Sequence, residues 1–303
     1  MRIISIILLL FLLNFISQLS FAQDDARFIQ FKQSYLNELY NGSYKKADSI
    51  IQKNESEFKS NSSYYLLSAN FFWWKIITGD KSKQNENQFF AQLNKSKKLN
   101  NRKNNQNVNH IDLRNSILIH AFKTRFEMLD NQYLSAVQDL KNCIDYLKTS
   151  FGKEEEYPDF LLTSGLYNYF SDYACEQYTF VRMVFKIYPR GNKHKGLLML
   201  GQATQKSDIF LKTESHYFLM KIYFDLEKDY PKAKINCRAL LNLYPENHIY
   251  QLYWIHIQKQ LNQYEDYKLK VDKFIISVNE NKSLNELQRL HLMKELEKIT
   301  HPN

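Results

Sequence analysis

Apolar residues recur along most of the chain at spacings of three and four positions, which is the period of an α-helix with one buried face. The stretch at residues 26–40 is typical, with Phe28, Phe31, Tyr35 and Leu39 on one side. The same pattern predicts about a dozen helices and no convincing strand. The predicted helices span residues 26–40, 44–58, 64–77, 84–99, 111–128, 133–147, 160–170, 173–187, 196–204, 208–226, 232–243, 248–261, 265–278 and 284–299.

Turn-forming residues are scarce, which supports an all-α fold. The 303 residues include only seven glycines and five prolines, whereas sheets and barrels need frequent turns. The plainest break is the polar run at residues 100–109, which lacks helical periodicity. We therefore expect N-terminal helical hairpins over residues 23–99, a polar linker loop over 100–110, and a longer helical array over 111–303.

Four of the seven glycines lie close together between residues 165 and 201. Gly165 stands among aromatic residues, and Gly191, Gly196 and Gly201 follow Pro189. In a chain with so little glycine, this grouping indicates a close backbone approach or a sharp corner. The weak boundary at Ser171-Asp172 leaves open whether residues 160–187 form one helix or two.

The N-terminus has the pattern of a secretory signal peptide. One arginine precedes an apolar run from Ile3 to Phe15, and small residues end at Ala22. The apolar run is shorter than the roughly 20 residues that span a bilayer, so cleavage after Ala22 is favoured over a membrane anchor. We expect residues 1–22 to be removed and the mature protein to be periplasmic or secreted.

Charge and cysteine content narrow the function classes. The net charge of +9 includes Arg2, so the mature chain carries a mild basic excess that does not specify nucleic acid. Export also disfavours a nucleic-acid partner. Cys143, Cys175 and Cys237 are far apart, which favours buried thiols over a disulfide scaffold or a cysteine metal site, although one disulfide stays open.

Three predicted helix starts share a tyrosine three residues before an alanine. The pairs are Tyr44 with Ala47, Tyr133 with Ala136, and Tyr230 with Ala233. Three residues are nearly one helical turn, so both side chains lie on one face. The small alanine allows a preceding antiparallel helix to approach closely while the tyrosine covers the turn. Cys143 and Cys237 fall on the same faces, so they are expected in helix-pair seams.

This pattern resembles the tetratricopeptide repeat, a helical hairpin of 34 residues with alanine early in its second helix and proline after it. The best copy runs from Glu214 to Glu246, with Ala233 inside the second helix and Pro245 at its end. Lys221 departs from the family at a normally small position. The resemblance implies antiparallel helical hairpins stacked as a tetratricopeptide-like α-solenoid.

Motifs for common catalytic and cofactor chemistry are missing. The chain has no Gly-x-Ser-x-Gly and no His-Glu-x-x-His motif. Gly191 and Gly196 have the outer spacing of a phosphate-binding loop, but Leu197-Leu198 follow instead of Lys-Ser/Thr. The histidines are dispersed, which argues against a metal site. We therefore expect no catalytic residue, cofactor or metal.

The leading hypothesis is a non-catalytic scaffold or adaptor that binds a protein or peptide partner in the cell envelope. Stacked hairpins curve, and their first helices form a concave groove. Aromatic residues and the basic corner beside Gly191 and Gly196 are the candidate partner-binding residues: Tyr167, Tyr169, Arg190, Lys193, Lys195, Tyr217 and Trp254.

Two further hypotheses concern anionic and sugar ligands. The basic run of Lys95, Lys97, Lys98, Arg102 and Lys103 would allow weak contact with an anionic membrane surface, although a solvated helix end is the simpler interpretation. The alternative function is a secreted all-helical enzyme or binding protein that acts on polysaccharide. As an enzyme it would need two converging carboxylates, and Asp159 and Asp172 are the local candidates.

Overall fold

The computed structural model describes residues 26–103, 109–177 and 188–301, and within these ranges every regular element is helical. The predicted signal peptide, residues 104–108 of the polar loop and residues 178–187 lie outside the described residues. A first helix at residues 26–40 precedes α2 (Tyr44–Phe58), α3 (Ser62–Ile77), α4 (Lys83–Lys103), α5 (His110–Leu129), α6 (Tyr133–Leu147), α7 (Phe160–Gln177), α9 (Lys193–Ala203), α10 (Ile209–Lys221), the π-helical turn η1 (Ile222–Leu226), α11 (Tyr230–Leu243), α12 (His248–Gln260), α13 (Tyr264–Glu280) and α14 (Glu286–Thr300).

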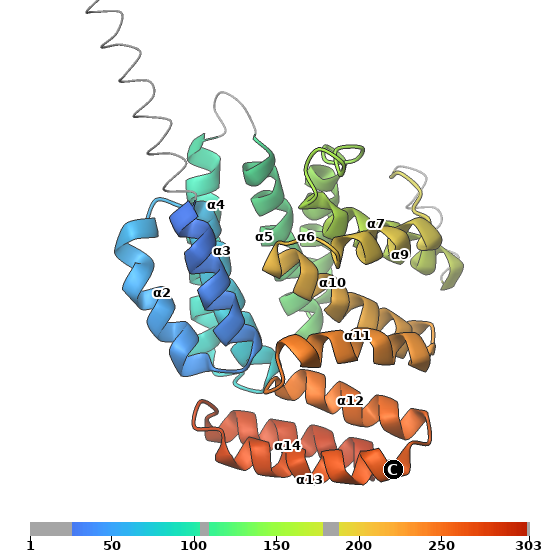
Figure 1. The fold of residues 1–303 in the computed structure, drawn as a ribbon. Coiled ribbons are helices and arrows are strands. Elements are labelled where there is room, and N and C mark those ends of the chain that lie inside the picture. The colour runs from blue at the N-terminus through green and yellow to red at the C-terminus, as the bar shows by residue number, and fades with distance from the viewer. Residues whose placement is uncertain (1–25, 104–108, 178–187, 302–303) are drawn as a thin grey trace, which may run out of the picture.

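Consecutive helices pack as hairpins, and the hairpins stack on one another. Helix α3 packs against α4, α5 against α6, α10 against α11, and α12 against α13. Figure 1 shows the stack running from α2 through α5 and α7 and then down through α10 and α12. The predicted all-α, solenoid-like architecture is therefore confirmed.

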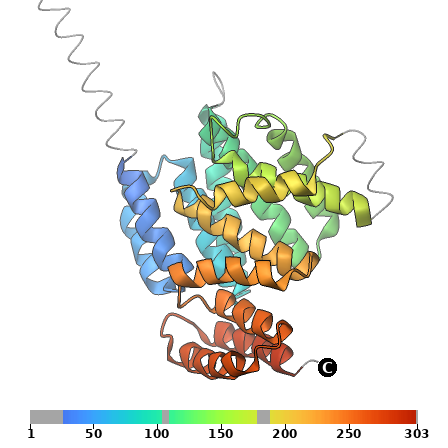
Figure 2. The same cartoon turned by 45° about the vertical axis from the view of Figure 1, so that its right-hand side comes forward.

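The two ends of the stack contact each other. Asn247, which precedes α12, donates to the carbonyl oxygen of Tyr40 at 2.5 Å. At the start of α14, Gln288 donates to Thr78 at 2.8 Å and Asn285 donates to Asp80 at 2.6 Å. Figures 1 and 2 show α12–α14 as a lower layer beneath the first hairpins and α11. The array curves far enough for its C-terminal helices to cap its N-terminal turns.

One continuous core joins the first hairpins to the last ones. It extends from Phe31 in the first helix to Leu296 in α14, and the large side chains of Tyr40, Trp74 and Tyr250 meet at its centre. The Trp74 ring lies 5.5 Å from Tyr40 and 5.9 Å from Tyr250, both edge to face. Aromatic pairs in this geometry stabilise a core beyond the area that they bury.

The tyrosine–alanine pairs lie where two helices approach closely. Ala47, Ala136 and Ala233 are all buried at helix contacts, and Tyr44 is buried beside Ala47. Tyr133 is the exception, because its ring is 56% exposed and its hydroxyl donates to the turn residue Asn131. The pattern predicted the position of each alanine better than the burial of each tyrosine.

The three cysteines are free and buried, which confirms the thiol interpretation. Cys143 on α6 contacts the carbonyl oxygen of Ile117 on α5 at 3.5 Å. Cys237 on α11 contacts the carbonyl oxygen of Tyr250 on α12 at 3.3 Å. Both thiols therefore lie in seams between packed helices, as the helix faces had indicated.

The glycine-rich stretch forms a close crossing of α7 and α9, as predicted. A Cβ atom on Gly196 would lie 2.6 Å from the carbonyl oxygen of Gly165 and 2.6 Å from the amide nitrogen of Tyr169. A Cβ atom on Gly191 would lie 2.5 Å from the carbonyl oxygen of Asn168. Neither position has room for a side chain, so the two backbones touch directly.

The structure moves one predicted helix boundary, resolves one that was left open, and distorts one helix end. Helix α4 continues to Lys103 instead of ending at Leu99, so the polar loop begins later than expected. Helix α7 continues through Ser171-Asp172, which makes that boundary internal to one helix. After Lys221 the backbone widens into a π-helical turn, and the Lys221 ammonium donates to Asp225 and to the hydroxyl of Tyr253. The departure from the repeat pattern thus coincides with a distorted helix end.

Candidate functional site

A cleft of about 530 Å³, which we call the inner cleft, lies where the N-terminal ends of five helices meet. These are the helix at residues 26–40, α3, α5, α7 and α10, which are the first helices of successive hairpins. The cleft is therefore formed by the first helices of the hairpins, the same helices that the repeat resemblance placed around a groove. Its volume lies within the 300–1,000 Å³ that is common for ligand pockets.

Capping residues give the cleft its polar character. Asn61 caps α3 and accepts from the amide of Ser63 at 2.9 Å. Asn109 caps α5, and Asp208 caps α10 in the same manner. Helices preferentially begin at such side chains because the first amides have no partner within the helix. Because several helices begin at one place, several polar caps collect there.

Two ion pairs connect helices across the cleft. Arg114 on α5 donates to Asp159 at the start of α7 at 2.6 Å, and Lys32 of the first helix pairs with Asp208. Burial alone would raise the pKa of Asp208, but the charge of Lys32 and the hydrogen bond that it donates hold that pKa below the usual value. Each of these four charges has an opposite charge beside it, and Asp112 is the fifth charged residue of the cleft lining.

A buried network of amides and hydroxyls holds the floor of the cleft in place. Asn115 on α5 donates to Ser62 at 2.8 Å and to Ser63 at 3.0 Å. Asn100 on α4 donates to the carbonyl oxygen of Asp112 and to the hydroxyl of Ser116, both at 2.8 Å. Buried polar groups that are fully hydrogen-bonded fix the relative position of their elements. The cleft is thus shaped before any ligand binds.

Apolar side chains stand exposed at the rim. Ile29 is 61% exposed and Ile111 is 39% exposed, and both line the cleft. Deeper in the cleft, Leu118 and Phe210 add apolar surface. An apolar rim around fixed donors and acceptors suits an extended peptide, which offers apolar side chains and backbone hydrogen-bonding groups at alternating positions.

Helix α6 carries a second exposed apolar surface. Leu134 is 92% exposed, Val137 66% and Leu140 45%, and the three residues follow one another along the helix. Leu140 was expected on the buried face with Cys143 and Ile144, but of these three residues only Cys143 and Ile144 are buried. Nothing in the described residues covers this exposed strip.

The predicted tyrosines of α7 pack against neighbouring helices, Tyr169 against α9 and Tyr167 against α5 and α6. Tyr167 and Tyr169 are buried, and their hydroxyls donate to the carbonyl oxygen of Pro189 and to Glu227, respectively. Burial and the hydrogen bond to Glu227 raise the pKa of Tyr169 well above its usual value. Both rings hold helices together and neither lines the inner cleft.

The predicted basic corner is present beside the crossing of α7 and α9. Lys193 lies 3.1 Å from Glu176 and 3.1 Å from Glu227, while Arg190 and Lys195 are exposed. Burial would lower the pKa of Lys193, but hydrogen bonds to the two glutamates outweigh it and raise that pKa. Lys193 is therefore already paired, and Arg190 and Lys195 are the exposed cations of this corner.

Tyr217 and Trp254 lie away from the corner. Tyr217 is a buried member of the main core, with its ring 6.2 Å from that of Tyr250. Trp254 is half-buried on α12, in a different pocket. The structure thus brings together five of the seven predicted residues, at the corner, and separates the other two. Partner binding at these residues stays a prediction.

The carboxylates proposed for an enzyme do not form a pair in one cleft. Asp159 lines the inner cleft and is engaged by Arg114, whereas Asp172 accepts from the amide of Lys193 at 2.9 Å and lies outside the cleft lining. Each position is explained by the packing of α7 against its neighbours. This removes the specific pair on which the enzyme hypothesis was based.

The sequence analysis missed the residues that shape the cleft, apart from Asp159. Lys32, Arg114 and Asp208 each looked like an ordinary solvent-facing charge on its own helix. The available signal was the position of each residue within the first turns of a predicted helix. That position points to a shared site only when the starts of these helices are known to lie together in space.

Metal binding and membrane spanning find no support in the described residues. Within residues 26–103, 109–177 and 188–301, no three His, Cys, Asp or Glu side chains are grouped so that they could hold a metal ion. Across the same ranges, no helix combines the length and apolar character needed to cross a bilayer.

Comparison with known proteins adds no relative. No protein-family model matches the chain. Searches of curated proteins and of solved structures likewise returned no significant match.

Proposed function

We propose that this protein is an exported, non-catalytic, tetratricopeptide-like scaffold that binds an extended segment of a partner protein in the cell envelope. The N-terminal signal pattern supports export, and the tyrosine–alanine hairpins support the repeat family. The observation that carries the binding proposal is the inner cleft, to which the first helices of five hairpins contribute.

The chemistry of the cleft favours a peptide segment over a charged small molecule. Four of its five charged lining residues are held in two ion pairs, so the cleft does not present a cluster of like charges to a small ion. Its rim offers Ile29 and Ile111 for apolar contact. Burying one such side chain on binding contributes about 1.5–3 kcal/mol, and 1.4 kcal/mol corresponds to a tenfold change in affinity.

The test is selection of binding peptides from a random library against the mature chain. Fluorescence polarisation of labelled peptides then gives their affinities for variants. We expect Ile29→Glu with Ile111→Glu to weaken the selected peptides by at least about tenfold, because a charge replaces apolar contact at the rim. Leu290→Glu is the matched control, since Leu290 is 68% exposed on α14, away from the cleft.

Two further variants identify a competing surface. Leu134→Glu with Val137→Glu alters the exposed strip of α6, and Arg190→Glu with Lys195→Glu alters the basic corner. If either double variant abolishes binding while the variant with glutamate at positions 29 and 111 binds normally, the inner cleft is not the site. Failure to select any peptide that the folded chain binds would contradict the proposed function itself.

A further inference from the structure

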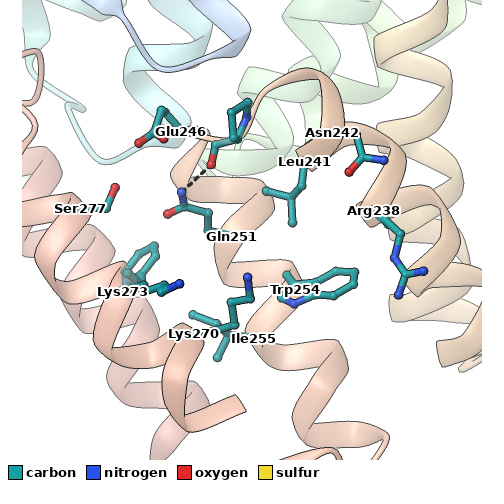
Figure 3. A pocket seen from close by; sticks show the side chains of 12 residues that line it. Arg238, Leu241, Asn242, Glu246, Gln251, Trp254, Ile255, Lys270, Lys273 and Ser277 are labelled. Carbon is teal, nitrogen blue, oxygen red and sulfur yellow. Dashed lines mark hydrogen bonds between the residues drawn. The ribbon is translucent and has the colours of Figure 1, made fainter. Parts of the chain in front are cut away.

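A second hollow of about 530 Å³ lies between α11, α12 and α13 and shares no lining residue with the inner cleft. Figure 3 shows its lining side chains, with Trp254 of α12 between Arg238 of α11 and the lysines of α13. Leu241, Ile255 and Phe274 give it an apolar floor. The hollow therefore combines an apolar base with a charged rim.

The cations of this hollow have no carboxylate partner among the described side chains. Arg238, Lys270 and Lys273 line it, and Glu246 is its one acidic lining residue. The Arg238 guanidinium lies 5.5 Å from the centre of the Trp254 ring. A cation–π contact holds a cation in place without neutralising its charge. This arrangement contrasts with the inner cleft, where Arg114 and Lys32 are each paired with an aspartate.

Two buried polar atoms on α12 lack partners within the described protein. The indole nitrogen of Trp254 has no acceptor, and the side-chain carbonyl oxygen of Gln251 has no donor. The amide nitrogen of Gln251 donates to the carbonyl oxygen of Pro245 at 2.7 Å, which fixes the orientation of that side chain. Residues three apart share a helix face, and both line this hollow. A ligand with both a hydroxyl donor and an oxygen acceptor would satisfy the two atoms.

We propose that the hollow between α11, α12 and α13 binds an anionic sugar, meaning a sugar ring that carries a carboxylate or a phosphate group. The anionic group lies among Arg238, Lys270 and Lys273, and the ring hydroxyls meet the carbonyl oxygen of Gln251. Free phosphate would leave that oxygen and the apolar floor without a partner. A flat membrane surface does not reach cations that line a hollow between three helices.

The test uses the intrinsic fluorescence of the mature chain, because Trp254 is the half-buried tryptophan while Trp73 and Trp74 are buried. Galacturonate and a glucose phosphate are titrated beside glucose, inorganic phosphate and phosphatidylglycerol vesicles. We expect a saturable emission change with at least one anionic sugar that is absent from Trp254→Phe. Glucose and inorganic phosphate should bind at least about tenfold more weakly.

Charge-removal variants test the lysines directly. Lys270→Gln with Lys273→Gln should weaken the anionic sugar at least about tenfold by isothermal titration calorimetry, and added salt should weaken it in the wild type. Lys45→Gln with Lys141→Gln removes the same charge from exposed positions on α2 and α6 and should leave the affinity unchanged.

Three results would overturn the proposal. The first is that neither anionic sugar saturates the emission change at about 10 mM, and the second is that glucose binds with the same affinity as the anionic sugars. The third is that vesicles bind in a manner that depends on Lys270 and Lys273 while the sugars do not bind. Because the two sites share no residue, loss of peptide binding at the inner cleft leaves this test intact.

Discussion

Replacing Gly196 with alanine tests the close crossing of α7 and α9. The added Cβ atom would lie 2.6 Å from two backbone atoms of α7, the carbonyl oxygen of Gly165 and the amide nitrogen of Tyr169, and 3.0 Å from the Cα of Tyr169. Backbone atoms cannot rotate away as a flexible side chain can. Helix α9 must therefore move away from α7, which loosens the buried cluster that includes Tyr169 and Leu200.

Two opposing terms set the size of the effect. Alanine is favoured over glycine within a helix by about 0.5–1 kcal/mol. Overpacking a well-packed contact costs about 1–3 kcal/mol, and the rigid neighbours place Gly196→Ala in the upper part of that range. We expect a net destabilisation of about 1–2 kcal/mol.

Gly201→Ala is the matched control, because Gly201 lies on the same helix and a Cβ atom there meets nothing within 4 Å. It should stabilise the protein by about 0.5–1 kcal/mol through helix propensity alone. Urea unfolding followed by far-ultraviolet circular dichroism gives the difference in stability, which we expect to be about 1.5–3 kcal/mol between the two variants. If Gly196→Ala is as stable as Gly201→Ala, the close approach of α7 and α9 does not exist.

Three further predictions concern buried polar groups. Burial lowers the pKa of His248 to about 4, whereas the pKa in the unfolded chain is about 6.5. The neutral imidazole therefore stabilises the fold above about pH 6.5, and this stability is lost as the pH falls from about 6.5 towards 4. Unfolding midpoints measured between pH 7.5 and pH 4.5 should therefore fall less steeply for His248→Gln, and equal slopes would contradict the buried neutral imidazole. Glu214→Gln keeps the acceptor for the Tyr40 hydroxyl but removes the charge that lies 3.7 Å from Arg125, so it should cost about 1 kcal/mol. Glu214→Leu removes both interactions and should cost about 1–3 kcal/mol in the same urea assay. Burial raises the pKa of Cys143 to about 12, so the thiols of the native protein should react slowly with a thiol reagent. All three thiols should react after unfolding, and rapid reaction of the folded chain would refute their burial.

Local patterns predicted the helices well because each helix is encoded by its own periodicity and its own ends. Asn41-Gly42 marked the end of the first helix, and Gly42 takes a φ of +76°, which favours glycine. Asn100 shows where local reasoning fails. Its neighbourhood is polar and looked like a loop, but the residue is buried and extends α4 because its amide meets Asp112 and Ser116 on α5. That contact depends on another helix and leaves no periodic trace near residue 100.

The candidate site was harder to predict than the fold because it is assembled from distant segments. Lys32 and Asp208 are 176 residues apart, and each is an ordinary helix-start residue when viewed alone. Aromatic residues attracted attention for their size, but most large aromatics in this chain, such as Tyr169 and Tyr217, are needed to fill the core. Trp254 was singled out and does line a pocket, although that pocket lies away from the concave groove expected for it.

The contacts between Asn247 and Tyr40, and between Gln288 and Thr78, have a mechanical consequence for the whole array. A stack of repeats with two free ends can extend, can widen its groove around a bulky ligand, and can unfold one hairpin at a time. Here the last hairpins secure the turns of the first, so opening the cleft would require breaking contacts at both ends together. We therefore expect the array to unfold in a single concerted step.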